Sequence, residues 1–319
     1  MKNYFTKEAF KNGFKVLSGA FNGFLDDKGL KLSAALAYYT VFSLAPLLLL
    51  LISLVGLFFK QDAINNKIFG EINGLVGNQA AKQVQDMIKS VSLSGKTTSA
   101  VIIASVVLLL GATSIFVEIQ DSINMIWKVK AKPKRGWLKL LQDRLLSSSL
   151  IVALGFLLIV SLVVNGLVLA LSGILTRFLP DITVILVNVV NLVISFIVIT
   201  ILFGVIFKVL PDVKIAWKDV RSGALFTAVL FMIGRFLIGL YISTTGTGST
   251  YGAAGSLIVI LVWVYYTSAI LYFGAEFTQV YAEFKGVKIE PASYAVHIEQ
   301  KEVERDVAVL PPQNKMDKE

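Results

Sequence analysis

The chain has 319 residues, of which 55% are hydrophobic and only 16% are charged, and its mean hydropathy is +0.74. This composition excludes an ordinary soluble domain, in which about a quarter of the residues are charged, and it indicates a membrane protein with several spans. The lack of cysteine excludes disulfides and thiolate metal sites. The formal net charge of +9 would suit nucleic-acid binding or basic cytoplasmic loops, and the placement of the charges distinguishes these two explanations.

Residues 1–30 are predicted to form an amphipathic helix. Two rows of side chains recur there at helical spacing, one of lysines and one rich in phenylalanine. The rows are Lys7, Lys11 and Lys15, and Phe10, Phe14, Leu17, Phe21 and Phe24. We predict a helix that lies in the membrane interface, and packing on the protein's own cytoplasmic side is an equally compatible alternative.

Residues 31–284 are predicted to form an all-α, polytopic transmembrane bundle of six spans. Each span is a mostly apolar run of about 20 residues or more, which is enough to cross the ~30 Å hydrocarbon core of a bilayer. The spans cover residues 33–59, 99–127, 145–175, 182–207, 222–242 and 251–281. Residues 60–98 are too polar to cross, and their apolar periodicity predicts amphipathic helices on the outer surface. Residues 285–319 are predicted to be a solvated, largely disordered cytoplasmic tail.

The distribution of Lys and Arg orients this bundle. Residues 1–31 hold six, 128–144 seven and 208–221 four, whereas 176–181 hold one and 243–250 none. Cytoplasmic loops carry the excess of positive charge in membrane proteins. Both termini are therefore predicted to be cytoplasmic, and nucleic acid is not expected as a partner because topology explains the positive charge.

Ionisable side chains inside the spans are the candidates for a functional site, because each costs ~2.5–3.5 kcal/mol at mid-bilayer on insertion scales. Glu118 and Glu276 each lie nine residues from a cytoplasmic end. At ~1.5 Å per residue, both are about 13 Å deep. The other polar or aromatic candidates in the cytoplasmic half are Tyr38, Tyr39, Thr40 and Asp121.

We predict that these six side chains line a polar cavity that opens toward the cytoplasm or the inner leaflet. The alternative is that they serve only as contacts between helices, with the acids paired to a hydroxyl group or to Arg144 or Arg221. Arg235 lies nearer the outer end of its span. It either snorkels to the outer interface or contacts an anion or a lipid headgroup.

Four blocks of the chain resemble the YihY/BrkB family of bacterial membrane proteins. The first two are ALAYYTVFSLAPLLLLLISLVGL at 35–57 and INMIW at 123–127. The others are LPDVKIAWKDVRSGALFTAVLF at 210–231 and YGAAGSLIVILVWVYYTSAILYFGAEFTQVYAEF at 251–284. The blocks follow one another in the expected order, so the resemblance extends from the N-terminal region to the end of the last span.

The resemblance implies a six-span protein of the bacterial cytoplasmic (inner) membrane, surrounded by membrane lipids, and favours transport of a lipid or small solute. A non-transporting structural or scaffolding protein of the envelope is the alternative, and self-association is compatible with either. The family also carries an older label as ribonuclease BN. A metal-dependent nuclease needs clustered carboxylates and histidines, yet the single histidine, His297, lies in the predicted tail. We therefore expect no enzyme, catalytic residue, metal or cofactor, and ribonuclease activity ranks last.

Overall fold

The computed structural model describes residues 7–56, 98–132, 136–138, 141–153, 156, 180–245 and 255–299. Three of the predicted features fall outside these residues in whole or in large part. They are the outer amphipathic segment up to residue 97, most of the third span, and residues 300–319 of the tail.

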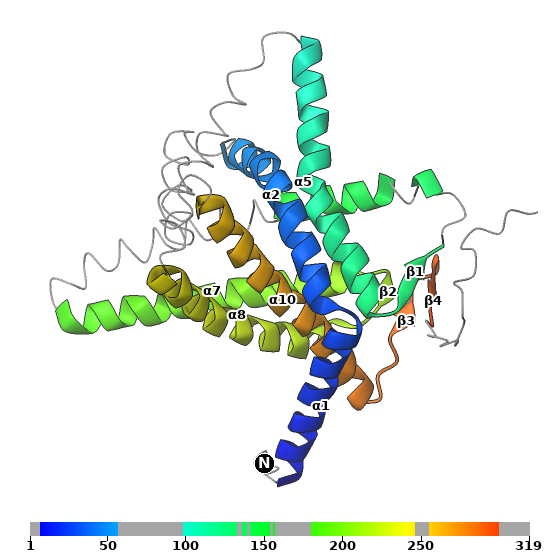
Figure 1. The fold of residues 1–319 in the computed structure, drawn as a ribbon, viewed down its shortest axis with the longest axis vertical. Coiled ribbons are helices and arrows are strands. Elements are labelled where there is room, and N and C mark those ends of the chain that lie inside the picture. The colour runs from blue at the N-terminus through cyan, green and yellow to red at the C-terminus, as the bar shows by residue number, and fades with distance from the viewer. Residues whose placement is uncertain are drawn as a thin grey trace, which may run out of the picture.

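Long helices make up most of the described residues (Figure 1). They are α1 (Lys7–Asp26), α2 (Gly29–Gly56), α5 (Thr98–Ile126), α7 (Pro180–Val209), α8 (Trp217–Thr245) and α10 (Gly255–Phe284). The last five coincide with predicted spans one, two, four, five and six. Among the described residues, three stretches are long and apolar enough to cross a membrane: Ile185–Val209, Trp217–Tyr241 and Ile258–Phe284.

The helices extend beyond the apolar runs from which the spans were predicted. The helix α8 begins at Trp217 rather than at residue 222, because the N–H groups of Asp219 and Val220 bond to the Ala216 carbonyl at 3.0 and 3.2 Å. At the end of α10, Gly286 has a φ of +72° and the Val287 N–H bonds back to the Ala282 carbonyl at 2.9 Å. This is the 6→1 bond of a Schellman motif, which ends a helix at a residue with positive φ.

Two short antiparallel strand pairs correct the all-α prediction. Strand β1 (Val129–Ala131) pairs with β4 (Ala295–His297), and β2 (Val213–Lys214) pairs with β3 (Glu290–Pro291). The prediction of a disordered tail is therefore wrong for residues 285–299, which fold back onto the ends of α5 and α7. His297 lies opposite Val129 in the first of these pairs. Strands of two or three residues are too short to produce an alternating pattern in the sequence.

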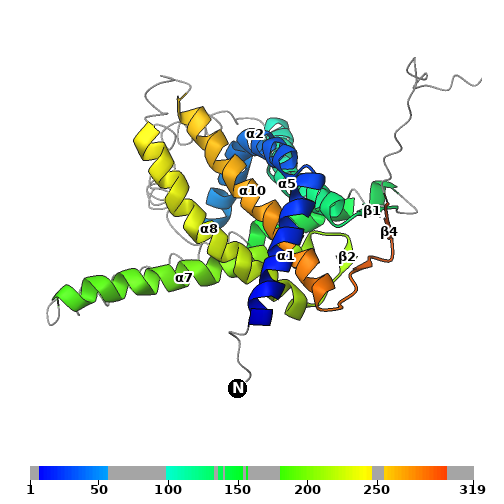
Figure 2. The same ribbon diagram turned by 60° about the horizontal axis from the view of Figure 1, so that its bottom comes forward.

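The helix α10 is the centre of the bundle. It packs against α1, α2, α5 and α8, while α7 packs mainly against α8. Figure 2 shows α8 on one side of α10, with α1, α2 and α5 on the other, and α7 extending away from them. A side chain on α10 can therefore contact several parts of the chain that are distant in sequence.

The helices α8 and α10 interlock through two matching pentapeptides, Gly-Ala-Leu-Phe-Thr at 223–227 and Gly-Ala-Glu-Phe-Thr at 274–278. A Cβ on Gly223 would overlap Thr278, and a Cβ on Gly274 would overlap Thr227. Small residues permit this close approach in membrane helix pairs. Each threonine hydroxyl donates to the carbonyl of the glycine in its own helix, at 2.7 Å for Thr227 and 2.6 Å for Thr278. The contact between the two helices here is therefore one of close steric packing, with each threonine against the glycine of the other helix.

The helix α1 has two different faces. Its packed face, which includes Val16, Ala20 and Phe24, lies against the bundle, and the Phe24 ring meets the Phe273 ring edge-on at 5.9 Å between centroids. A second apolar row is exposed on the described part of the chain: Phe14, Leu17, Phe21 and Leu25. Packing on the protein itself therefore accounts for only one side of this helix.

Candidate functional site

Glu276 is buried where α10 meets α1. Only 3% of the residue is exposed, and its Oε1 atom has no hydrogen-bond partner among the described residues. The opposing position on α1 is Gly23, where a Cβ would come within 2.7 Å of the Glu276 Oε2 atom. The charged side chains that act on this carboxyl group are Asp27, Lys128 and Glu283. One base and two acids thus surround a buried acid.

A second group of buried polar atoms lies one turn earlier on α10. Tyr272 is fully buried, and its hydroxyl interacts with Ser122 and with the charge of Glu118, both on α5. The Ser122 and Tyr272 hydroxyls approach one another without forming a hydrogen bond of normal geometry, and neither has another partner within the described structure. We call Glu118, Ser122, Tyr272 and Glu276 the polar seam. Both predicted glutamates belong to it.

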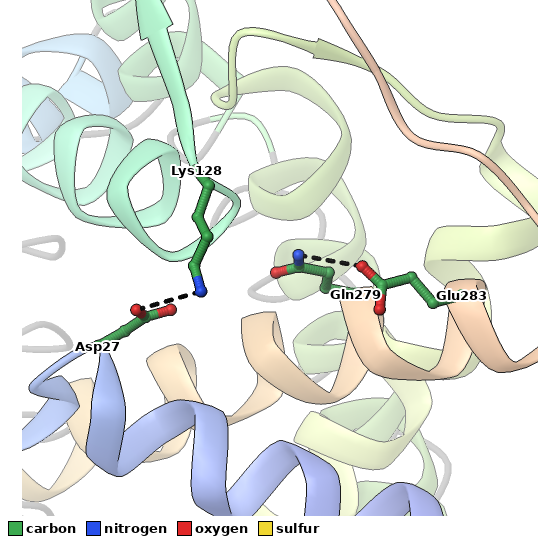
Figure 3. A network of polar contacts seen from close by, with 4 residues as sticks. All are labelled: Asp27, Lys128, Gln279 and Glu283. Atoms are coloured by element: carbon green, nitrogen blue, oxygen red, sulfur yellow. Dashed lines mark hydrogen bonds and ion pairs between the residues drawn. The ribbon is translucent and has the colours of Figure 1, made fainter. Parts of the chain in front are cut away.

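Lys128 forms an ion pair at the edge of the seam, where α1 meets α2. Its Nζ atom lies 3.6 Å from Asp27 Oδ1 (Figure 3). Lys128, two residues after the end of α5, has a φ of +55°, and Asp27 lies in the turn between α1 and α2. Beside this pair, Gln279 Nε2 donates to Glu283 Oε1 at 3.3 Å along α10. The pair joins two chain corners directly next to Glu276.

The tyrosines of the first predicted span, Tyr38 and Tyr39, do not lie in the polar seam. Tyr38 is 59% exposed and packs against the rings of Tyr39 and Phe42, on the side of α2 opposite its buried residues. Thr40 is buried, and its hydroxyl donates to the Leu36 carbonyl in its own helix at 2.7 Å. The contact from α2 to α5 is made instead by Ser43, whose hydroxyl lies 2.7 Å from that of Ser114.

Asp121 lies at the edge of the polar seam: it is exposed on α5, and its charge acts on the Glu118 carboxyl group. Arg235, exposed on α8, is not part of the seam. Arg144 donates to Thr113 Oγ1 at 2.8 Å and to the Leu110 carbonyl at 3.2 Å, so its described contacts are with α5 rather than with either glutamate. The alternative that pairs Glu118 or Glu276 with Arg144 therefore finds no support in these contacts.

Asp212 is a polar centre that the sequence interpretation did not single out. It is 2% exposed and accepts hydrogen bonds from Gln120 at 3.2 Å, Asn124 at 2.9 Å and the Tyr294 hydroxyl at 3.0 Å. Its own N–H donates to Asn124 Oδ1 at 2.8 Å, and its carbonyl accepts the Ala292 N–H at 2.9 Å. We call these four side chains the Asp212 network. Gln120 and Asn124, polar and one turn apart at the end of a span, were the only sequence signal for it.

The contacts within these clusters are hydrogen bonds and charge interactions. Within the described ranges, no group of three or more His, Asp or Glu side chains is placed to hold a metal ion. The polar seam offers two carboxyl groups and two hydroxyls. Such groups can accept a proton, a cation or the polar part of a ligand.

The comparisons with known proteins agree with the resemblance in the sequence. The chain is 28% identical to a UPF0761 membrane protein of Stenotrophomonas maltophilia over 84% of its own length and 61% of that protein's. It is 27% identical to one of Pseudomonas paraeruginosa, over 84% of this chain and 63% of that protein. The chain thus spans about three fifths of the length of these relatives. No solved structure matches it. Residues 20–297 match the virulence factor BrkB family, and the chain belongs to that family.

Proposed function

We propose that this protein moves a lipid or a small solute across the bacterial cytoplasmic (inner) membrane and that the polar seam is part of the path. The observation that carries the proposal is a set of three buried polar atoms without partners in the described part of the chain. They are Ser122 Oγ and Tyr272 OH, where α5 meets α10, and Glu276 Oε1, where α10 meets α1. No covalent chemistry is involved, so the protein acts as a permease rather than as an enzyme.

The free-energy cost of burying these three atoms without hydrogen-bond partners argues against a purely structural role. Buried polar side chains in folded proteins nearly always have a hydrogen-bond partner, and leaving one unpaired costs about 1–3 kcal/mol. Ionisable groups at membrane depth are commonly found where substrates, ions or protons pass. A seam that binds a polar ligand atom while it passes would provide the partners that these three groups lack.

The proposed topology has six spans with both termini in the cytoplasm. In support, the basic segments predicted to be cytoplasmic meet at one end of the bundle. Asp27 meets Lys128 there, Asn124 meets Asp212, and strands β3 and β4 return to the same place. The exposed apolar row of α1 is suited to the membrane interface on that side.

A non-transporting scaffold of the envelope is the alternative, and the Asp212 network is the observation that favours it. That network is well bonded and fixes residues 290–297 to the bundle. A fixed surface of this kind suits the recruitment of a partner. Under this alternative the polar seam would be a contact between helices only.

Transport can be tested with the purified full-length chain in liposomes. The assay measures translocation of fluorescent phospholipids and uptake of a panel of labelled solutes, for the native chain, Glu276→Gln and the control Glu8→Gln at the exposed start of α1. We expect Glu276→Gln to reduce flux at least tenfold with an unchanged melting temperature, and Glu8→Gln to behave as the native chain. Flux that is equal in all three, or a change in abundance alone, would contradict the proposal.

A further inference from the structure

We propose that the crevice between α7 and α8 binds an anionic phospholipid of the cytoplasmic leaflet, with an acyl chain in the crevice and the phosphate at Lys218 and Arg221. The crevice has a volume of about 400 Å³, within the range of small-molecule sites. It is separate from the polar seam. The proposal uses the cytoplasmic placement of this end of the bundle but does not depend on transport.

The walls of the crevice are suited to a hydrocarbon chain. They are almost entirely apolar, with Ile201 and Gly204 from α7 and Val220 and Ala224 from α8. At Gly204, the nearest atoms to an added Cβ would be the Ala224 Cβ and Trp217 Cζ3, both at 3.7 Å, so the absence of a side chain there leaves space. Ala224 lies seven residues from Trp217, which makes the crevice about 10 Å long along α8.

The mouth of the crevice is basic and aromatic. Trp217, Lys218 and Arg221 line it within the first two turns of α8, and all three are exposed. Trp, Lys and Arg at the cytoplasmic end of a span are typical of the level of the lipid headgroups. Asp219, which is in the same turn, is not part of the lining. Lys208, the last basic residue of α7, donates to the Ile215 carbonyl and so is directed at the backbone.

The two cations at the mouth of the crevice favour an anionic phospholipid as its ligand. Two cations at the open end of an apolar crevice match a molecule that has a phosphodiester at the end of a hydrocarbon chain. Arginine binds phosphate oxygens with two parallel N–H groups, while lysine acts as a point charge. A second copy of this chain would have to bury both cations to occupy the crevice, and burying a charge is costly unless it is paired.

The test uses quenching of tryptophan fluorescence by brominated phospholipids, with the full chain in detergent. Brominated phosphatidylglycerol is compared with brominated phosphatidylcholine, and a Trp217→Phe variant isolates the signal of Trp217 from the other three tryptophans. The variants are Lys218→Gln with Arg221→Gln, Gly204→Leu, and the control Lys130→Gln with Lys132→Gln, which removes two exposed charges on or beside β1.

We expect phosphatidylglycerol to quench Trp217 at a concentration on the order of tenfold lower than phosphatidylcholine, because basic residues attract anionic headgroups. The double substitution at 218 and 221 should abolish this preference, and the control should keep it. Gly204→Leu should reduce quenching by both lipids. Equal quenching by both lipids in the native chain would overturn the proposal. Protection of Trp217 that rises with protein concentration would also overturn it, in favour of a second copy. Because Lys218 and Arg221 are exposed, their variant tests the proposal even if Gly204→Leu fails to fold.

Discussion

Gly23 on α1 lies directly against the carboxyl group of Glu276 on α10, so a methyl group at position 23 would come within 2.7 Å of Oε2. The Gly23→Ala substitution should therefore force the Glu276 side chain out of its place. We expect a destabilisation of about 1–2 kcal/mol, since overpacking outweighs the gain in helix propensity. The measurement is thermal unfolding in detergent.

The control for this prediction is Gly13→Ala on the same helix, where an added Cβ meets nothing within 4 Å. That substitution should stabilise α1 by about 0.5–1 kcal/mol. Equal melting temperatures for the two variants would show that Glu276 does not depend on the glycine opposite it.

The Gly223→Ala substitution should separate α8 from α10, because the new methyl group would overlap Thr278. We expect a loss of about 2–3 kcal/mol, at the upper end of the usual range for overpacking. Adding Thr278→Gly should restore part of it, and a double-mutant cycle measures the coupling. Gly239→Ala, in an open part of α8, is the control. Additive effects of the two substitutions would mean that the residues do not interlock.

Removing the Asp212 carboxylate should leave Gln120, Asn124 and Tyr294 without their common acceptor. We expect Asp212→Ala to cost about 3 kcal/mol or more, and Tyr294→Phe, which removes a single donor, about 1 kcal/mol. Hydrogen exchange should also accelerate at Ala292, whose N–H bonds to the Asp212 carbonyl. Unchanged exchange in Asp212→Ala would show that residues 290–297 are held by other contacts.

Lys128 should stabilise the fold more strongly when Glu276 carries its carboxyl group. As half of a partly exposed ion pair with Asp27, it contributes at most about 1 kcal/mol. Lys128→Gln should lower the melting temperature of the native chain more than that of Glu276→Gln, because it leaves Asp27 and Glu276 without a basic neighbour. An equal change in both backgrounds would mean that the ion pair and Glu276 are independent.

The packing of residues 285–299 against the ends of α5 and α7 can be tested by disulfide cross-linking, because the chain contains no native cysteine. Lys130 and Val296 are opposite one another in the β1–β4 pair, and both side chains are exposed. Cysteines at these two positions should form a disulfide under mild oxidation, since cross-strand Cβ atoms lie close to the spacing that a disulfide requires. A pair at Lys130 and Lys288 is the control and should stay reduced. Failure of the first pair to cross-link would contradict the observed register.

Hydropathy predicted which segments are helices, but not which side of each helix packs. Tyr38 and Thr40 were predicted to line one cavity, and the structure places Thr40 inside and Tyr38 outside. The two residues are only two positions apart in sequence but lie on different sides of the helix, and an almost uniformly apolar span contains no periodicity that orients it. Glu118 and Glu276 were singled out in the sequence because a carboxyl group in such a span is costly whichever way it faces.

The Asp212 network could not be predicted because its members come from distant segments. Asn124 and Asp212 are 88 residues apart, and Tyr294 is a further 82 residues along the chain. Each of them is ordinary in its own segment: an amide near a helix end, an acid in a loop, a tyrosine in a polar tail. The last two come together because β3 pairs with β2 and β4 pairs with β1.

The interlock of α8 with α10 also determines which parts of the bundle can move. Each threonine hydroxyl bonds within its own helix, and the stacked rings of Phe226 and Phe277, with centroids 3.8 Å apart, fill the space beside the glycines. Sliding one helix along the other would drive a threonine into the backbone opposite it. We therefore expect α8 and α10 to behave as a single rigid body. Under the proposed transport function, we expect the polar seam to open by movement of α1, α2 and α5 relative to α8 and α10.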